Sequence, residues 1–114
     1  MKSELYAVEL RTVRWEEMLA WYRKRLGMRA LIRIPEEQYA LLEAGNARLA
    51  LIGRDAPDET SARWSLALEC DDLDEALRVV APAGARILRN SEGYQELLVH
   101  DPDGNRVRLF SWPG

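Results

Sequence analysis

Hydrophobic and polar residues follow one order of patterns along the first half of the chain. Residues 5–12 alternate apolar and polar side chains, which predicts a half-buried strand. Apolar residues then recur at helical spacing from Trp15 to Leu26, and Gly27 is a suitable residue to end that helix. Three short strand-like runs follow, at 28–34, 38–43 and 47–52. Gly45-Asn46 predicts a turn between the last two strands.

The same order begins again after a polar segment. Residues 54–62 are rich in turn-forming residues and predict a linker. An alternating strand is expected at 64–69, followed by a helix that Asp72 caps, with Glu75 placed as in a capping box. Three further strands are expected, at 85–88, 94–99 and 106–110. Residues 101–105, Asp-Pro-Asp-Gly-Asn, predict a tight turn before the last strand.

The two halves overlay on one another with little drift. Shifts of 57 and 59 residues place Gly27-Met28-Arg29 on Gly84-Ala85-Arg86, and Gly45-Asn46 on Gly104-Asn105. We therefore predict a single α+β domain, residues 1–114, made of two tandem βαβββ modules. Their expected bounds are 4–53 and 63–112, joined by the linker 54–62. An α+β sandwich without duplication is the alternative.

Composition and charge narrow the class of protein. The 114 residues suit one domain, and a net charge of −3 without a long basic run argues against nucleic-acid binding. No apolar stretch approaches the ~20 residues of a membrane span, and the first residues do not resemble a secretory signal. Cys70 is the only cysteine and cannot form an intramolecular disulfide, which favours a cytoplasmic protein. The basic segment 21–25 is interpreted as the solvated end of the first helix.

Three stretches resemble the vicinal oxygen chelate superfamily of glyoxalases, extradiol dioxygenases and bleomycin-resistance proteins. They are residues 8–12 with the following helix to Gly27-Met28, residues 66–76, and residues 101–110. The resemblance implies that both modules form a curled mixed sheet, a half-barrel around a cavity, with the helices outside. It also implies a homodimer. Trp21, which lies off the apolar stripe of the first helix, is a candidate interface residue.

The metal ligands of that superfamily have no counterparts at the matching positions. Ala7 and Ser65 stand where the resemblance implies histidines, and Arg108 stands where it implies a glutamate. The matching region of the first module, residues 47–51, has no carboxylate or imidazole. A permanent cation such as Arg108 repels a divalent ion. We therefore expect no metal ligands and no cofactor.

Strand alternation predicts which side chains face the cavity. The candidate ligand-binding residues are Glu9, Arg11, Ser65, Glu69, Arg106, Arg108, Phe110 and Trp112. One interpretation is that four charged residues of this set pair with one another across the sheet: Glu9, Glu69, Arg11 and Arg108. The other is that an arginine holds a carboxylate or phosphate of a ligand through its bidentate fork.

The leading hypothesis is a metal-free protein that binds a small molecule, as a homodimer, with no nucleic-acid or membrane partner. The alternative is a metal-dependent lyase, isomerase or dioxygenase with a relocated site formed by Glu9, Glu69 and His100. A metal-free enzyme with Glu9 as general base, and a purely structural role, also stay open. Cys70 precedes the second helix, a position that can lower a thiol pKa, but we expect an inert thiol because the single histidine is distant.

Overall fold

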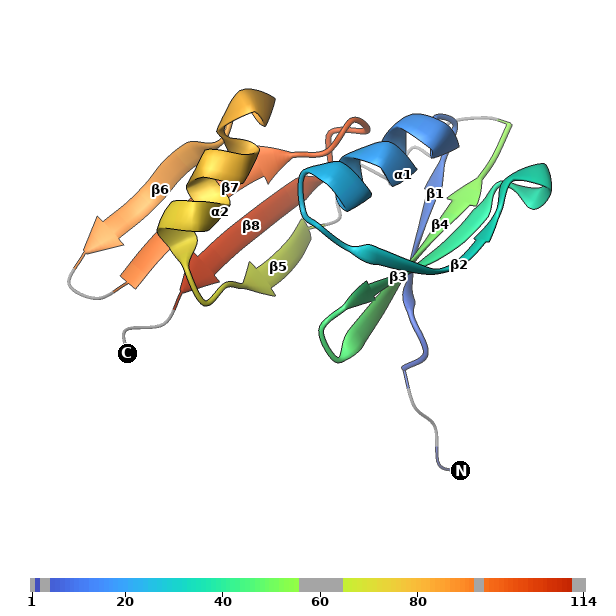
Figure 1. Ribbon diagram of the computed structural model, residues 1–114, viewed down its shortest axis with the longest axis horizontal. Helices are drawn as coiled ribbons and strands as arrows, with labels where there is room; N and C mark the ends of the chain where they lie inside the picture. Colours follow the sequence, from blue (N-terminus) through green and yellow to red (C-terminus); the bar gives the residue numbers. More distant parts are fainter. Residues whose placement is uncertain (1, 3–4, 56–64, 92–93, 112–114) are drawn as a thin grey trace. The chain divides into compact units, whose positions relative to one another are not determined.

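The chain forms two compact units, residues 1–61 and 62–114. The computed structural model describes residues 2, 5–55, 65–91 and 94–111 (Figure 1). The boundary between the units falls inside the segment 54–62 that was predicted as a linker, most of which lies outside the described residues. None of the described helices is long and apolar enough to cross a membrane.

The first unit is one four-stranded mixed sheet with a helix. Its elements are β1 (Val8–Thr12), α1 (Trp15–Lys24), β2 (Arg29–Ile34), a 3-10 turn (Pro35–Glu37), β3 (Tyr39–Ala44) and β4 (Ala47–Gly53). The strand order is β1-β4-β3-β2, with β1 parallel to β4 and the other pairs antiparallel. The first strand is shorter than predicted, because residues 5–7 do not join the ladder with β4.

The second unit repeats this arrangement element by element. It contains β5 (Ser65–Glu69), α2 (Leu73–Val80), a 3-10 turn (Ala81–Ala83), β6 (Arg86–Ser91), β7 (Tyr94–His100) and β8 (Arg106–Ser111). The order β5-β8-β7-β6 and the single parallel pair, β5 with β8, match the first sheet. The predicted α+β fold of two βαβββ modules is confirmed, and β6 extends beyond its predicted end.

Backbone irregularities recur at equivalent places in the two modules. The pairing of β2 with β3 skips Leu31, and the pairing of β6 with β7 skips Leu88 at the equivalent position. The described glycines with positive φ form two equivalent pairs, Gly27 (66°) with Gly84 (87°) and Gly45 (62°) with Gly104 (85°). Glycine adopts these angles readily, whereas residues with a Cβ rarely do, so the overlay matched positions with the same backbone requirement.

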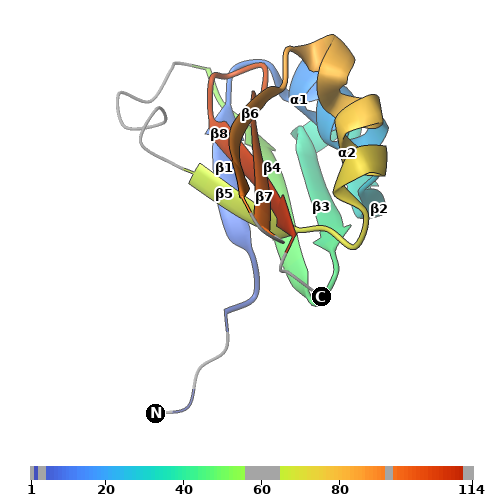
Figure 2. The same cartoon turned by 90° about the vertical axis from the view of Figure 1, so that its left-hand side faces the viewer.

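Each helix covers one face of the sheet in its own unit (Figures 1 and 2). The apolar stripe of α1 is buried, and its members are Trp15, Met18, Leu19 and Tyr22. The indole Nε1 of Trp15 donates a hydrogen bond to the Leu51 carbonyl at 3.0 Å, which fixes the helix to β4. On α2, Leu73 and Val80 are buried. The predicted cap is present, because the Asp72 carboxylate accepts from the backbone N–H of Glu75 at 3.1 Å.

The turn between β7 and β8 is organised by Asp101, which is 4% exposed. One carboxylate oxygen, Oδ1, accepts from the backbone N–H groups of Asp103 and Asn105, both at 2.9 Å. The other, Oδ2, accepts from the Asn105 side-chain amide at 2.8 Å. This carboxylate therefore accepts hydrogen bonds from two backbone N–H groups of the turn, and it sets where β8 begins.

Candidate functional site

The candidate site lies on the face of each sheet opposite its own helix. In β1, Glu9 and Arg11 are exposed while Leu10 and Thr12 are buried, as strand alternation predicts. In β5, Ser65 and Glu69 are exposed. All four therefore lie on the face that their own helix does not cover. Trp112, the last predicted site residue, lies outside the described residues.

Three side chains meet on this face of the second unit. The Arg108 guanidinium lies 5.1 Å from the centre of the Phe110 ring, close enough for a cation–π contact. Its Nη1 donates to Glu96 Oε1 at 3.3 Å, and the side chains of Arg108 and Glu96 are 34% and 13% exposed. Arg108 and Phe110 were predicted, whereas Glu96 on β7 was missed. No alternation in the run 94–99 marks Glu96, because residues 95 and 96 are both polar and residues 97–99 are all apolar.

The remaining predicted residues of the second unit lie along the same strands as this cluster. Glu69 on β5 is the register partner of Phe110, and Phe110 is in turn the partner of Glu96. Ser65 is the register partner of Arg106 at the opposite end of β8, and both are exposed. The structure therefore joins Glu69, Phe110 and Glu96 in one row of side chains, with Arg108 two residues away on β8. Arg106 lies four residues from Phe110 and outside this cluster.

The predicted pairing of Arg108 needs a correction. The sequence hypothesis paired the cavity arginines with Glu9 and Glu69, but the carboxylate bound to Arg108 is that of Glu96. The reason is register: Ala67 on β5 stands beside Arg108, whereas β7 places Glu96 diagonally across from it.

A divalent metal does not fit the relocated donor set of the alternative hypothesis. Glu69 shares a row with Phe110, whereas His100 pairs with Arg106, four residues away along β8. Four strand residues span about 13 Å, whereas ligands of one ion all lie within about 2.6 Å of it. Across residues 5–55, 65–91 and 94–111, no group of three acidic, histidine or cysteine side chains could hold a metal.

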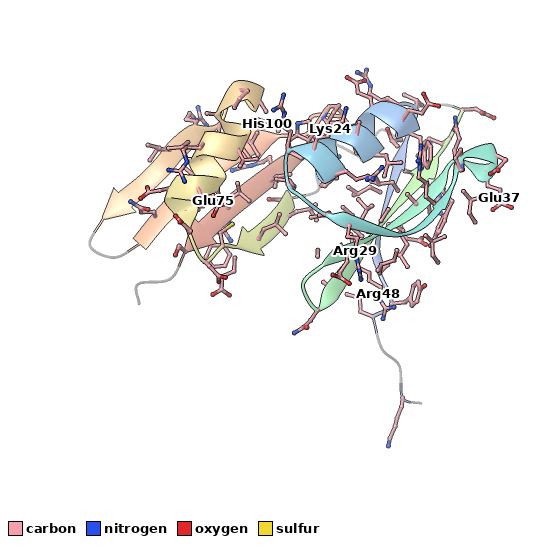
Figure 3. The ribbon with its side chains drawn as sticks, viewed as in Figure 1. Lys24, Arg29, Glu37, Arg48, Glu75 and His100 are labelled. Atoms are coloured by element: carbon pink, nitrogen blue, oxygen red, sulfur yellow. The ribbon has the colours of Figure 1, made fainter. Side chains whose placement is uncertain are left out.

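The corresponding face of the first unit is also rich in charge and aromatic rings. Burial raises the pKa of Tyr39, with smaller contributions from Tyr6 and from the negative charge of Glu9. The guanidinium of Arg48 lies 4.6 Å from the centre of the Tyr6 ring. Figure 3 labels Arg48 on β4. A neutral phenol beside a carboxylate supplies one hydrogen-bond donor and one acceptor for a polar ligand.

Cys70 is not poised as a nucleophile. Burial raises the pKa of its thiol, and the negative charges of Asp71 and Glu69 raise it further. The helix N-terminus therefore does not lower this pKa, because burial and, to a smaller extent, the nearby carboxylates oppose ionisation. The expectation of an inert thiol agrees with this direction.

Comparison with known proteins identifies the family. The model of the Glyoxalase/Bleomycin resistance protein/Dioxygenase superfamily matches residues 5–109, so the chain belongs to this superfamily. The predicted resemblance is thereby confirmed. No curated protein matches the sequence.

Solved structures show the same fold at low sequence identity. A protein from the mobile metagenome of V. Pseudocholerae is 22% identical, with a TM-score of 0.75 over 100% of this chain and 98% of that chain. TioX from Micromonospora sp. ML1 is 22% identical, with a TM-score of 0.72 over 96% and 95%. Lactoylglutathione lyase from Agrobacterium tumefaciens is 17% identical, with a TM-score of 0.70 over 96% and 94%. At these identities the likeness concerns the fold alone.

Proposed function

We propose that this chain is a small-molecule-binding member of its superfamily that works without the usual metal. The observation that carries the proposal is the cluster of Arg108, Phe110 and Glu96 on the helix-free face of the second sheet. It occupies the strand on which the family resemblance implied a metal-binding glutamate. A cation in that place favours an anionic ligand over a divalent ion.

The chemistry of the cluster suits a flat ligand that carries a carboxylate or phosphate. A guanidinium presents five N–H donors in a planar fork, so a ligand anion can share or replace the Glu96 contact. Phe110 offers an aromatic surface for an apolar ring. At 34% exposure the Arg108 side chain can still be reached from solvent.

The experiment is a calorimetric titration with 2-naphthoate, a flat aromatic carboxylate. Arg108→Gln should weaken binding at least about tenfold, because a charge-assisted hydrogen bond contributes about 1.5–3 kcal/mol. Phe110→Leu should weaken it severalfold. The matched control is Arg78→Gln, which removes the same charge from an exposed position on α2. If Arg108→Gln bound 2-naphthoate with the same affinity as the control variant Arg78→Gln, this site would be refuted.

Metal content of the purified protein separates the proposal from the enzyme alternative. After incubation with manganese, iron, nickel or zinc and desalting, elemental mass spectrometry should find far less than one metal per chain. One tightly held metal would instead favour a lyase, isomerase or dioxygenase.

The proposal keeps two further expectations, a homodimer and a cytoplasmic location. A light-scattering mass equal to one chain would refute the dimer.

A further inference from the structure

A groove of about 670 Å³ lies on the helix side of the first unit, between α1 and β2. Its α1 wall contributes Trp15, Glu16, Leu19, Ala20, Arg23 and Lys24, and the other wall contributes residues 28–30 and Arg33. Ala30 of β2 pairs with Leu42 of β3, which in turn pairs with residue 49 of β4. Arg33 of β2 pairs with Ala40 of β3, which in turn pairs with residue 51 of β4. Trp15 of α1 donates to the Leu51 carbonyl, and Leu51 pairs with the buried Leu10 of β1. The groove therefore lies on the helix-covered face of the first sheet, opposite to the face that carries Glu9 and Arg11.

The walls of this groove are strongly cationic in a chain whose net charge is −3. Its lining includes the cations Arg23, Lys24 and Arg33 and one acid, Glu16. Arg29 also lines the groove, but its side chain lies on the opposite face of β2, where it pairs with Glu43. Figure 3 labels Lys24 on α1 and Arg29 on β2.

Among the residues that the structure describes, Arg23, Lys24 and Arg33 have no counter-ion. Arg29 is bound to Glu43 at 3.1 Å, with both side chains largely exposed. Arg23, Lys24 and Arg33 are exposed, and within the described part of the chain none of them forms an ion pair. Like charges gathered around one concavity repel one another, and a bound anion removes that repulsion.

The floor between these cations is apolar. Trp15, Leu19 and Met28 are 3%, 4% and 8% exposed, and Ala20 and Ala30 add small half-buried side chains. The alanines leave the space that a ligand chain would fill. The volume falls in the range of about 300–1,000 Å³ that is usual for small-molecule sites.

We propose that this groove is a second binding site, for an amphiphilic anion with a carboxylate or phosphate head and an aliphatic body. The guanidinium groups of Arg23 and Arg33 hold the head, and the floor beside Ala20 takes the body. This site is independent of the aromatic-anion site at Arg108.

The test is a calorimetric titration of the full chain with probes that share a ten-carbon body. Decanoate and decyl phosphate separate the two possible heads, decyltrimethylammonium reverses the charge, and acetate removes the body. We expect decanoate or decyl phosphate to bind and the cationic probe not to bind. Acetate should bind at least about tenfold more weakly than decanoate, because each buried methylene contributes about 0.8 kcal/mol.

Arginine variants test whether the probe binds in the groove. Arg23→Gln and Arg33→Gln should each weaken binding at least about tenfold. The matched control is Arg25→Gln, because Arg25 is exposed at the same end of α1 but does not line the groove. Arg108→Gln should leave decanoate binding unchanged. Circular dichroism and thermal unfolding confirm that each variant is folded.

Three results would overturn the groove site: no binding of either anion, equal binding of the cationic probe, or equal affinity in Arg23→Gln, Arg33→Gln and Arg25→Gln. Loss of decanoate binding in Arg108→Gln alone would assign the anion to the sheet face, so the groove proposal would fail while the proposed function stands. If the protein does not bind 2-naphthoate at Arg108 but still binds decanoate in the groove, the proposed function fails and the groove site stands.

Discussion

Replacing Asp101 by alanine removes the acceptor that organises the β7–β8 turn. Its carboxylate accepts two backbone N–H groups, those of Asp103 and Asn105, and the Asn105 side-chain amide. Asp101 and Asn105 are 4% and 3% exposed, so water has little access to the donors that would be left behind. The turn precedes β8, the strand that carries Arg108 and Phe110. The substitution therefore acts on both the fold and the proposed site.

The size of the effect follows from these contacts. A hydrogen bond to a charged group contributes about 1.5–3 kcal/mol, and neighbouring bonds in one network are not additive. We expect Asp101→Ala to lower the free energy of unfolding by about 3 kcal/mol. For a chain of this length, that loss corresponds to a fall in Tm of about 12 °C. Asp101→Asn keeps one carbonyl oxygen as an acceptor and should lose about half as much.

The assay is urea and thermal unfolding followed by circular dichroism. The control is Asp71→Ala, which removes the same charge from an exposed position of the second unit and should change stability by less than about 0.5 kcal/mol. If Asp101→Ala were as stable as this control, water or a rearranged turn would be satisfying the donors. The carboxylate would then not determine where β8 begins.

Three further predictions concern single side chains. Asp72→Ala should cost about 1 kcal/mol in urea unfolding, because α2 loses the acceptor for the Glu75 N–H, and Asp72→Ser should restore most of it. At about pH 8, Cys70 should react with a disulfide reagent more slowly than free cysteine, because its raised pKa leaves less thiolate; a faster rate contradicts this. The raised pKa of Tyr39 stabilises the fold at pH values below the ordinary phenol pKa of about 10, and this contribution is lost as pH rises through the folded pKa. Urea unfolding at about pH 9 and pH 11.5 should therefore show a smaller loss for Tyr39→Phe than for the unaltered chain, and equal losses would refute the assignment.

Local chemistry made much of the fold predictable. The cap at Asp72 and the turn glycines Gly45 and Gly104 depend on residues close in sequence, and the structure shows each of them. Alternation in β1 and β5 predicted which side chains are exposed, because the two faces of a strand differ every second residue. The start of β1 was predicted too early, since alternation continues through residues 5–7 while the ladder with β4 does not.

The candidate site was only partly predictable. The partner of Arg108 depends on the register of β7 against β8, which no local pattern records, so Glu96 was missed. The separation of Glu69 from His100 depends on the same ladder, and it removes the relocated metal site that composition alone left open. The cationic groove depends on how α1 lies against β2, so residues 21–25 were interpreted only as a solvated helix end.

The sequence by itself determined the repeat, the element types and the superfamily, because periodicity, caps and turn residues act over a few positions and occur twice. Only the tertiary structure decided which charges meet, which cations lack a counter-ion among the described residues, and how far apart potential ligands lie. Those quantities depend on strand register and helix placement, which bring together residues that are distant along the chain.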